Sequence, residues 1–273
     1  LILRSKIRKV IVGMRDPDPR VAGKGIDILR ANGLEVITGV LEDEVAFQNR
    51  AFVFRVRNGR PWGTLKWAMS CDGRTGLPNG ESKWISCSES RRNVHCLRSK
   101  CDAVIVGGET VRTDNPLLTS RGIAKKEPLR VVFSSSLQFP INSQIWDTNQ
   151  ANTLICYGPD SETSLLNDLP DGPEKILLEE NTPTKLLEML AQKGCNQVLW
   201  ECGSSLATNA IQHDCVQEIL LFLSPKILGG VSAMTPLADL GFESMEQVIN
   251  LKEIASYKKE DDFVLNMVFD NHL

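Results

Sequence analysis

The first sixty residues alternate between short apolar runs and stretches whose apolar positions have helical spacing. In chain order they predict a strand over 7–12, a helix over 25–31, a strand over 34–37 and a helix over 41–56. Acidic residues at the start of the second helix fit the positive end of its dipole. The segment is therefore a β-α-β-α fragment, and Asn58-Gly59-Arg60-Pro61 marks the predicted boundary between domains 1–58 and 61–273.

After Pro61 a new alternation of strands and helices begins. Strands are predicted over 62–69, 103–106, 129–133, 153–157, 175–178, 197–201 and 218–223, with helices over 88–99, 183–193 and 204–213. Two further strands, over 251–257 and 262–269, are predicted to pair antiparallel at the end of the chain. Strands that alternate with helices predict an α/β layer fold with a mostly parallel sheet.

The composition of the chain argues against nucleic acid and membrane as binding partners. The chain has 273 residues, 42% of them hydrophobic and 24% charged, and a formal net charge of -3. Such a balance is typical of globular proteins and offers no basic field for a nucleic-acid backbone. No apolar stretch reaches the roughly 18 residues of a membrane span, and the start carries no signal-peptide cleavage region. We expect a soluble intracellular protein that binds neither nucleic acid nor membrane.

Cysteine and histidine do not form a metal-binding pattern. The eight cysteines contain no C-x-x-C pair, and the three histidines are dispersed along the chain. Buried thiols are the expected role of the cysteines. No metal site is predicted.

Within residues 197–211, a predicted strand ends at Glu201 and a predicted helix begins at Gly203-Ser204-Ser205. Glycine allows a ligand close to the backbone, and free amides at a helix start attract phosphate oxygens. These features suggest a nucleotide phosphate at residues 203–206. When the stretch is taken alone, a turn at Gly203 with Ser204 as the helix cap is the favoured interpretation.

The stretch VGGETVRTDNPLLTSRG, residues 106–122, also follows a strand. Thr110 and Asp114 stand four apart after Gly107-Gly108, and Asn115-Pro116 stops any helix at once. One short turn can present a hydroxyl and a carboxylate to the same ligand. Each residue taken singly is also typical of a capped turn.

Between the strand over 62–69 and the next helix lies a long polar loop that ends near Trp84. We interpret it as a lid or cofactor wall, with a surface excursion anchored by Trp84 as the alternative. Arginines follow at positions 91, 92, 98 and 121. Two convergent arginines suit a phosphorylated sugar, whereas Arg91 and Arg92 are expected on a solvated helix face.

From Pro61 onward the chain resembles the reductase domain of the bifunctional riboflavin-biosynthesis deaminase/reductase family. The matching words, in the order of that family, are LKWAMSCDGRTG, GESKWIS, VGGETVRTDNPLLTSRG, PLRVVFSSS and WECGSSLATNAI with LSPKILGG. The first segment is similar to the C-terminal end of the family's zinc deaminase domain. The H-x-E and P-C-x-x-C motifs that hold zinc in such deaminases are absent from the chain. We therefore assign it no deaminase activity, whether it is truncated or its upstream half is separate.

The resemblance implies a dihydrofolate-reductase-like fold and NADPH-dependent reduction of 5-amino-6-(5-phosphoribosylamino)uracil to its ribitylamino counterpart. Carried over by position, the residues that would line NADPH are Ala68, Trp84, Thr110, Asp114, Ser135, Gly203, Ser204, Ser205 and Leu206. Those that would line the substrate are Ser82, Arg98, Leu118, Arg121 and Glu201. Cys202 and Ser204 depart from the usual GGP-type loop of the family, which affects the local loop shape.

We predict that Glu201 is the proton donor for hydride transfer to the ribose C1′, or a clamp for a substrate hydroxyl. A homodimer is expected, in the cytoplasm or, in a plant, in the plastid stroma. Two alternatives stay open: an enzyme of the same fold with another substrate, such as a dihydrofolate reductase, and a non-catalytic nucleotide-binding or scaffold module. NADPH binding without oxidation in the presence of substrate would favour the second.

Overall fold

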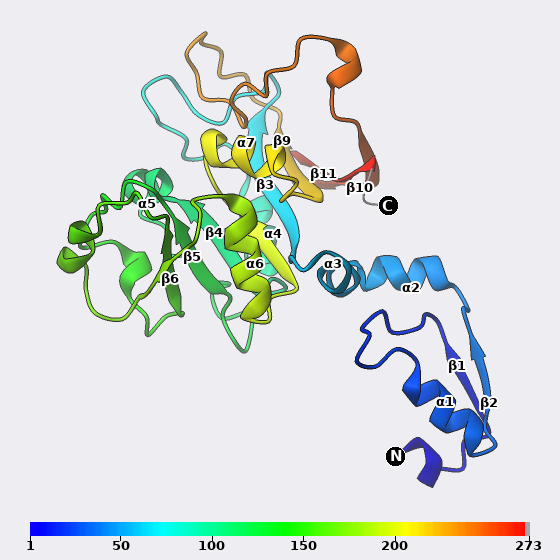
Figure 1. Cartoon of the computed structure of the whole chain (residues 1–273). Coiled ribbons are helices and arrows are strands. Elements are labelled where there is room, and N and C mark those ends of the chain that lie inside the picture. The colour runs from blue at the N-terminus through cyan, green and yellow to red at the C-terminus, as the bar shows by residue number, and fades with distance from the viewer. Residues whose placement is uncertain (271–273) are drawn as a thin grey trace. The chain divides into compact units, whose positions relative to one another are not determined.

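The computed structural model describes residues 1–270, which divide into two compact units (Figure 1). The first unit is Leu1–Arg60 and the second begins at Pro61. Each unit has a sheet of its own, a parallel pair of strands in the first and a mostly parallel sheet of nine strands in the second.

The first unit contains a short 3-10 helix, Ile2–Arg4, followed by β1 (Lys9–Val12), α1 (Lys24–Ala31), β2 (Glu35–Thr38), α2 (Glu42–Gln48) and α3 (Arg50–Asn58). β1 and β2 pair in parallel, with Lys9 opposite Glu35. No residue of either strand is fully buried. The buried apolar side chains of this unit lie on its helices, at Ile26, Val53 and Phe54.

The helix predicted over 41–56 is two helices, so that prediction was wrong at its centre. Asn49 separates them with φ -100° and ψ 17°, outside the helical range. Its Nδ2 donates to the carbonyl of Val45 at 2.8 Å. An asparagine side chain that bonds the backbone competes with the helical ladder, and this local competition cannot be seen from apolar spacing.

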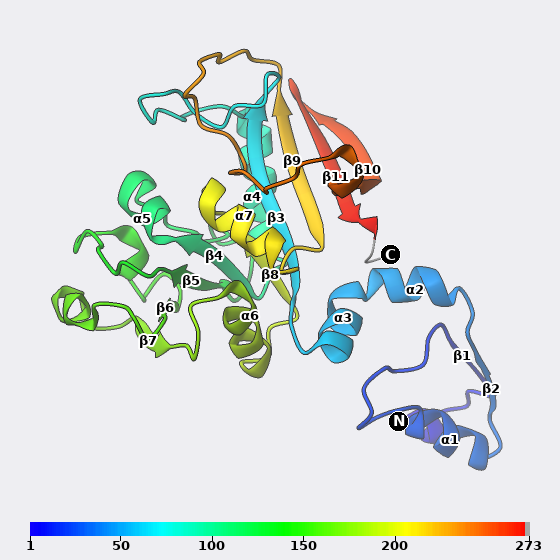
Figure 2. The same cartoon turned by 45° about the horizontal axis from the view of Figure 1, so that its top comes forward.

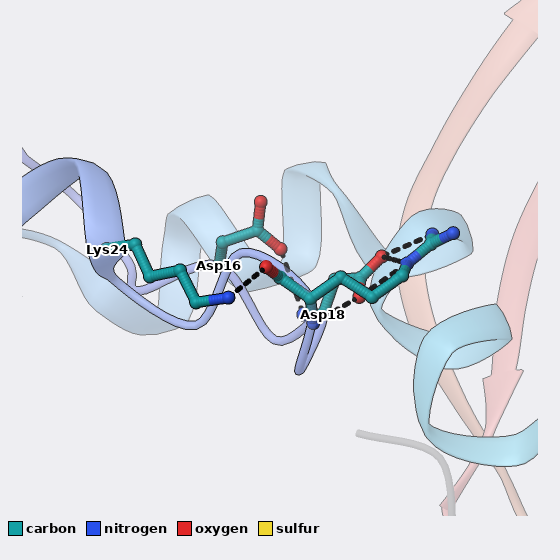
Figure 3. Close-up of polar contacts among 4 residues, drawn as sticks. Asp16, Asp18 and Lys24 are labelled. Carbon is teal, nitrogen blue, oxygen red and sulfur yellow. Dashed lines mark hydrogen bonds and ion pairs between the residues drawn. The ribbon is translucent and has the colours of Figure 1, made fainter.

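The turn before α1 is organised by a carboxylate (Figure 3). Asp18 accepts from the backbone amide of Arg20 at 2.9 Å and from its guanidinium, and Lys24 Nζ donates to the Arg20 carbonyl at 3.0 Å. The hydrogen bonds from Arg20 lower the pKa of Asp18 to about 2. The DPDP stretch is thus an ordered turn rather than a simple break between elements.

The second unit is built on a nine-stranded sheet with the order β10-β11-β9-β3-β8-β4-β5-β6-β7 (Figure 2). Its strands are β3 (Trp62–Ser70), β4 (Ala103–Gly107), β5 (Leu129–Phe133), β6 (Thr153–Tyr157), β7 (Glu174–Leu177), β8 (Gln197–Trp200), β9 (Glu218–Ser224), β10 (Leu251–Lys259) and β11 (Asp262–Phe269). Its helices are α4 (Ser88–Arg98), α5 (Gly108–Asp114), α6 (Pro183–Gln192) and α7 (Ser204–Gln212), with 3-10 turns at Gln144–Trp146, Thr163–Asp168 and Met245–Gln247. β11 is antiparallel to β9 and to β10, and the other pairings are parallel. The predicted mostly parallel α/β sheet with a closing antiparallel pair is confirmed.

Both faces of this sheet are covered. On one face, alternate strand residues such as Ala103 and Ile105 pack with α6 and α7. On the other, Val104 and Val106 pack with α5, and α4 covers Leu220 and Phe222 of β9. Figures 1 and 2 show α6 and α7 on the face opposite α4. A parallel sheet covered on both faces directs its loops to the two strand edges, and ligands bind at the carboxyl edge.

Candidate functional site

The two glycine-containing turns meet at the carboxyl edge of the sheet. β4 and β8 are hydrogen-bonded neighbours, and the Glu201 amide donates to the Ile105 carbonyl at 2.9 Å. A Cβ on Gly107 would stand 3.5 Å from Leu206 Cδ2. The turn at Gly107 and the start of α7 therefore lie side by side.

The start of α7 is open and has no side-chain cap. A Cβ added to Gly203 would meet no atom within 4 Å, so a ligand can approach this backbone. Ser204 is half-buried and Ser205 exposed. Burial raises the pKa of the Cys202 thiol to about 12, so it stays uncharged beside this turn. Free amides, hydroxyls and a missing Cβ fit a nucleotide phosphate.

Residues 108–114 form the seven-residue helix α5, where the sequence predicted only a short turn. Asn115, with φ 44°, ends it as predicted, and its Oδ1 accepts from the amide of Gln144, which begins a distant 3-10 turn, at 2.8 Å. Thr110 and Asp114 stand one helical turn apart, on one side of α5. The charge of Asp114 acts on Lys66 of β3, which places this carboxylate near the middle of the sheet edge.

Arg98 and Glu201 form a mostly buried ion pair. Arg98 Nε and Nη2 donate to the two carboxylate oxygens of Glu201 at 2.6 and 2.9 Å, and Nη1 donates to the Thr119 carbonyl at 3.1 Å. Their side chains are only 13% and 11% exposed. A two-pronged contact of this kind fixes both partners in position.

Glu201 is ionised in this arrangement. Burial alone would raise the pKa of its carboxyl, but the charge and hydrogen bonds of Arg98, together with the charge of Lys66, outweigh burial and hold the pKa below its ordinary value. The same pair raises the pKa of Arg98 despite its burial. A carboxylate with both oxygens engaged and a lowered pKa is a poor proton donor.

Lys66 is the functional candidate that the sequence reasoning missed. It is half-buried on β3, and its Nζ lies 5.7 Å from the centre of the Phe222 ring. Burial lowers its pKa, while Glu201 raises it and Arg98 lowers it further. The signal was one lysine inside the otherwise apolar run WGTLKWAM. A lysine with a lowered pKa releases its proton more readily than one in water.

His95 and Arg121 complete the charged cluster. His95 lies one turn before Arg98 on α4, with its Nδ1 3.5 Å from Arg98 Nη1. Burial, Arg98 and Arg121 all lower the pKa of His95, which shows that Arg121 is close enough to act on it. Arg121 is exposed and has φ 56°. The structure thus brings the predicted residues Arg98, Arg121 and Glu201 to one edge.

The long loop around Trp84 is tied to the loop after β9. Asp72 accepts from Ser70 Oγ and from the amides of Leu228 and Gly229, and hydrogen bonds from these groups lower its pKa to about 2. Lys226 Nζ donates to the carbonyls of Trp84 and Ile85 at 2.7 and 2.8 Å. Figures 1 and 2 show the two loops side by side beyond the carboxyl end of β3.

Trp84 forms an exposed aromatic wall on this loop. Its side chain is 62% exposed, and the Arg91 guanidinium lies 4.5 Å from its ring centre. Arg91 also donates to the Ser86 carbonyl at 2.6 Å. The expectation that Arg91 is merely solvated was wrong, since it braces the tryptophan. Arg92 lies on the exposed side of α4 and pairs with Glu89.

The remaining predicted residues occupy different environments. Ala68 is half-buried on β3, Ser82 is half-buried in the Trp84 loop, and Ser135 is exposed in the segment that follows β5. Leu118 is only 3% exposed and packs in the core, so it can offer a ligand backbone atoms alone. Its φ of 57° turns the chain toward Thr119, whose carbonyl holds Arg98.

A family profile described as the RibD C-terminal domain matches residues 61–265. The chain belongs to this family. The match covers the whole charged cluster, both glycine turns and the loop of Trp84. Family membership therefore applies to the unit that contains the candidate site.

Relatives extend the similarity to the first unit. The riboflavin biosynthesis protein RibD of Synechocystis sp. is 47% identical over 254 residues, which cover 93% of this chain and 69% of that protein. The chloroplastic riboflavin biosynthesis protein PYRR of Zea mays is 33% identical, with 97% and 44% of the two chains covered. The chain thus spans less than half of that plant relative.

A solved structure from Thermotoga maritima is similar to this chain. It is titled a diaminohydroxyphosphoribosylaminopyrimidine deaminase/5-amino-6-(5-phosphoribosylamino)uracil reductase. It has a TM-score of 0.84 to this chain at 29% identity, over 98% of this chain and 73% of the other. This RibD-family similarity supports the predicted fold class over both units.

Within residues 1–270, no helix is long and apolar enough to cross a membrane. The same residues contain no group of three histidine, cysteine, aspartate or glutamate side chains placed to hold a metal ion. The charged cluster at the sheet edge is built of ion pairs and hydrogen bonds between side chains and backbone.

Proposed function

We propose that this chain reduces 5-amino-6-(5-phosphoribosylamino)uracil to 5-amino-6-(5-phosphoribitylamino)uracil with NADPH, in riboflavin biosynthesis. One observation carries the proposal: the partly buried cluster of Lys66, Arg98 and Glu201 lies at the same sheet edge as the open, uncapped start of α7. The charged cluster suits proton transfer, and the start of α7 suits the phosphate of a dinucleotide.

The residues at the start of α7 fit the cofactor. The missing Cβ of Gly203 and the uncapped amides at 204–206 would hold its pyrophosphate, and Thr110 and Asp114 would border it from α5. Trp84 would border the cofactor from the long loop after β3. When bound, the cofactor supplies hydride to the ribose C1′ of the substrate.

Lys66 is the proposed proton donor. In the ring-opened imine form of the substrate, C1′ accepts hydride and the imine nitrogen accepts a proton, which gives the ribitylamine and the oxidised cofactor. Lys66 has a lowered pKa and Glu201 does not favour donation, because both of its oxygens bind Arg98. Glu201 then serves as the counter-ion of Lys66 and Arg98, and it keeps its second predicted role as a clamp for a substrate hydroxyl.

Arg121 is the proposed main contact for the substrate phosphate. It is exposed, and its charge acts on His95, next to Arg98. Arg98 is already engaged by Glu201 and Thr119, so its part is to hold the cluster in place. A planar guanidinium that is open to solvent can bind phosphate oxygens in pairs.

The test is the absorbance at 340 nm when the phosphoribosylaminouracil is added to the chain with NADPH. We expect a fall in absorbance that depends on substrate. Arg121→Ala should raise KM for the substrate about tenfold or more, with little change in KM for NADPH. Arg92→Ala, on the exposed face of the same region, is the matched control and should change neither.

Two results would contradict the proposal. NADPH binding without oxidation would instead support a non-catalytic nucleotide-binding module. Oxidation with dihydrofolate but not with the phosphoribosyl compound would support another enzyme of related fold. Equal effects of Arg121→Ala on both KM values would remove Arg121 from the phosphate site.

We also propose that the chain acts as a homodimer without deaminase activity of its own. The first unit has no H-x-E or P-C-x-x-C motif, and it would serve as a scaffold. Light scattering of the purified chain tests the dimer, and a single-chain mass would reject it.

A further inference from the structure

The proposed phosphate contact, Arg121, is not fixed through its own side chain. It is exposed, and within residues 1–270 no hydrogen bond or ion pair holds its guanidinium. A group that becomes ordered only on binding costs entropy, so a fixed backbone beneath an arginine lowers the cost of holding a ligand. The place of this guanidinium therefore depends on residues 119–122, which we call the Arg121 segment.

One carboxylate organises the Arg121 segment. Glu127 Oε2 accepts from the Ser120 amide, and Glu127 Oε1 accepts from Ser120 Oγ at 2.9 Å and from the Gly122 amide at 3.1 Å. Ser120 is fully buried, and its hydroxyl also accepts from the Ala124 amide at 3.1 Å. Because Ser120 and Gly122 flank Arg121, the side chain of Glu127 holds the backbone directly before and directly after the arginine.

The backbone conformation of the segment requires such support. Arg121 has φ 56°, in the left-handed region that residues with a Cβ rarely adopt. A residue keeps this conformation only where its surroundings impose it. At the start of the segment, the Thr119 carbonyl accepts from Arg98 Nη1. The segment is thus tied to the Arg98–Glu201 pair at one end and to Glu127 around the arginine.

Glu127 is ionised, and its charge is compensated. Burial raises the pKa of its carboxyl, but hydrogen bonds from Ser120 and Gly122 outweigh burial and hold the pKa below its ordinary value. Its charge also acts on two guanidinium groups, those of Arg98 and Arg130. A carboxylate whose charge is matched in this way can stand near a bound phosphate without preventing its binding.

We propose that Glu127 is a positioning residue for the substrate: it fixes the backbone on both sides of Arg121 so that the guanidinium meets the substrate phosphate. This assignment rests on the proposed function and deepens it, since it names what places the arginine. Glu127 contacts neither substrate nor cofactor in this role. Its removal therefore acts through Arg121.

The charge of Glu127 lets an experiment decide by sign. If the carboxylate acted only as a nearby negative charge, its removal would strengthen the binding of a phosphate dianion. If it positions Arg121, its removal weakens that binding. The two roles predict opposite changes in KM for the phosphorylated substrate.

The experiment compares steady-state constants of the full chain, with NADPH, for the phosphoribosylaminouracil and for the same compound without its phosphate. Glu127→Ala should raise KM for the phosphorylated compound about fivefold or more. It should leave kcat, KM for NADPH and kcat/KM for the dephosphorylated compound within about twofold. Glu127→Gln keeps one acceptor oxygen and should lie between. Glu188→Ala, which removes a carboxylate of α6 that pairs with Lys185, is the control and should change none of these values.

A double variant tests whether Glu127 acts through Arg121. Once Arg121→Ala has removed the guanidinium, Glu127→Ala should raise KM by less than a further factor of about two. Additive effects of the two changes would overturn the inference. An unchanged or lowered KM in Glu127→Ala would overturn it as well. So would equal losses for the phosphorylated and dephosphorylated compounds, because they indicate general damage to the fold.

A binding measurement separates this inference from the proposed function. If the wild-type chain oxidises no NADPH with the phosphoribosylaminouracil, the proposed function fails. The dissociation constant for ribose 5-phosphate, measured by calorimetry, then decides the role of Glu127. Weaker binding by both Glu127→Ala and Arg121→Ala supports that role. Unchanged binding by Glu127→Ala, or no binding by the wild-type chain, overturns it.

Discussion

The chain contains a parallel two-stranded sheet and a mostly parallel nine-stranded sheet, and the two differ in how they are covered. In the nine-stranded sheet, Val104, Ile105 and Val106 of one strand are inaccessible to solvent because helices pack on both faces. In the two-stranded sheet, Ile11 is 61% exposed and no strand residue is fully buried. Parallel pairing alone therefore does not make a core, and only the covered sheet can lower the pKa of a lysine and shield an ion pair.

The comparison is sharpest for two lysines that both lie on strands. Lys66 is half-buried on β3 with a lowered pKa, and Lys9 on β1 pairs with Glu35 at the surface, where its side chain is 49% exposed. Lys66→Met should lower kcat by about 10²- to 10⁴-fold, the usual contribution of a general acid. Lys9→Met should leave kcat unchanged. Steady-state rates at saturating substrate make the comparison, and a Lys66→Met enzyme with wild-type kcat would remove Lys66 from proton transfer.

The Arg98–Glu201 ion pair of the second unit should contribute more to the free energy of unfolding than the Lys9–Glu35 pair of the first. Glu201→Gln leaves Arg98 buried with no charged partner, and removal of one member of a buried pair costs about 3–5 kcal/mol of unfolding free energy. Glu35→Gln breaks a pair between exposed side chains and should cost no more than about 1 kcal/mol. Urea unfolding followed by circular dichroism measures both. Similar losses would mean that the Arg98–Glu201 pair is not effectively shielded.

Two glycines extend the comparison to packing. A Cβ on Gly63 of β3 would lie 2.1 Å from the Cys215 carbonyl oxygen, so Gly63→Ala must displace backbone and should cost about 1–3 kcal/mol. Gly25 of α1 has nothing within 4 Å of its Cβ position, and Gly25→Ala should stabilise its helix by about 0.5–1 kcal/mol. Thermal unfolding of the two variants tests the signs. Destabilisation by Gly25→Ala would show that the first unit is packed more tightly than its structure indicates.

The pH profile gives the smallest expected effect. A donor must be protonated, so kcat should fall as the pH rises through the pKa of Lys66, and burial moves this alkaline limb below the ordinary range of lysine. Lys66→Arg should move the limb upward, because arginine holds its proton more firmly. A limb at the same pH in both enzymes would assign it to another group.

Much of the second unit was predictable because its strands are continuous apolar runs bounded by turns. The turns that end β4 and β8 were predictable from Gly107 and Gly203, and binding of a ligand at these turns stays a prediction. Asn49, which splits a helix, was not predictable, since its effect depends on a side-chain bond to Val45. Apolar spacing describes which face is buried and says nothing of such local competition.

The charged cluster was predictable only in part. Arg98 and Glu201 were both candidates, but they are 103 residues apart in the sequence, and nothing in their spacing shows that they bind each other. That pairing moved the proposed proton donor from Glu201 to Lys66. A single lysine in an apolar strand acquires meaning only when the fold places a carboxylate near it.

The central claim is that hydride passes to C1′ of a phosphoribosyl substrate bound at this edge. The most direct measurement supplies the chain with NADPH deuterated at the transferring C4 position and locates the label in the product by mass spectrometry and NMR. We expect one deuterium per product molecule, at C1′ of the ribityl group. With Lys66→Met, the amount of labelled product should fall by the same factor as the turnover rate. A reduced product with no label, or with the label on the pyrimidine ring, would contradict it.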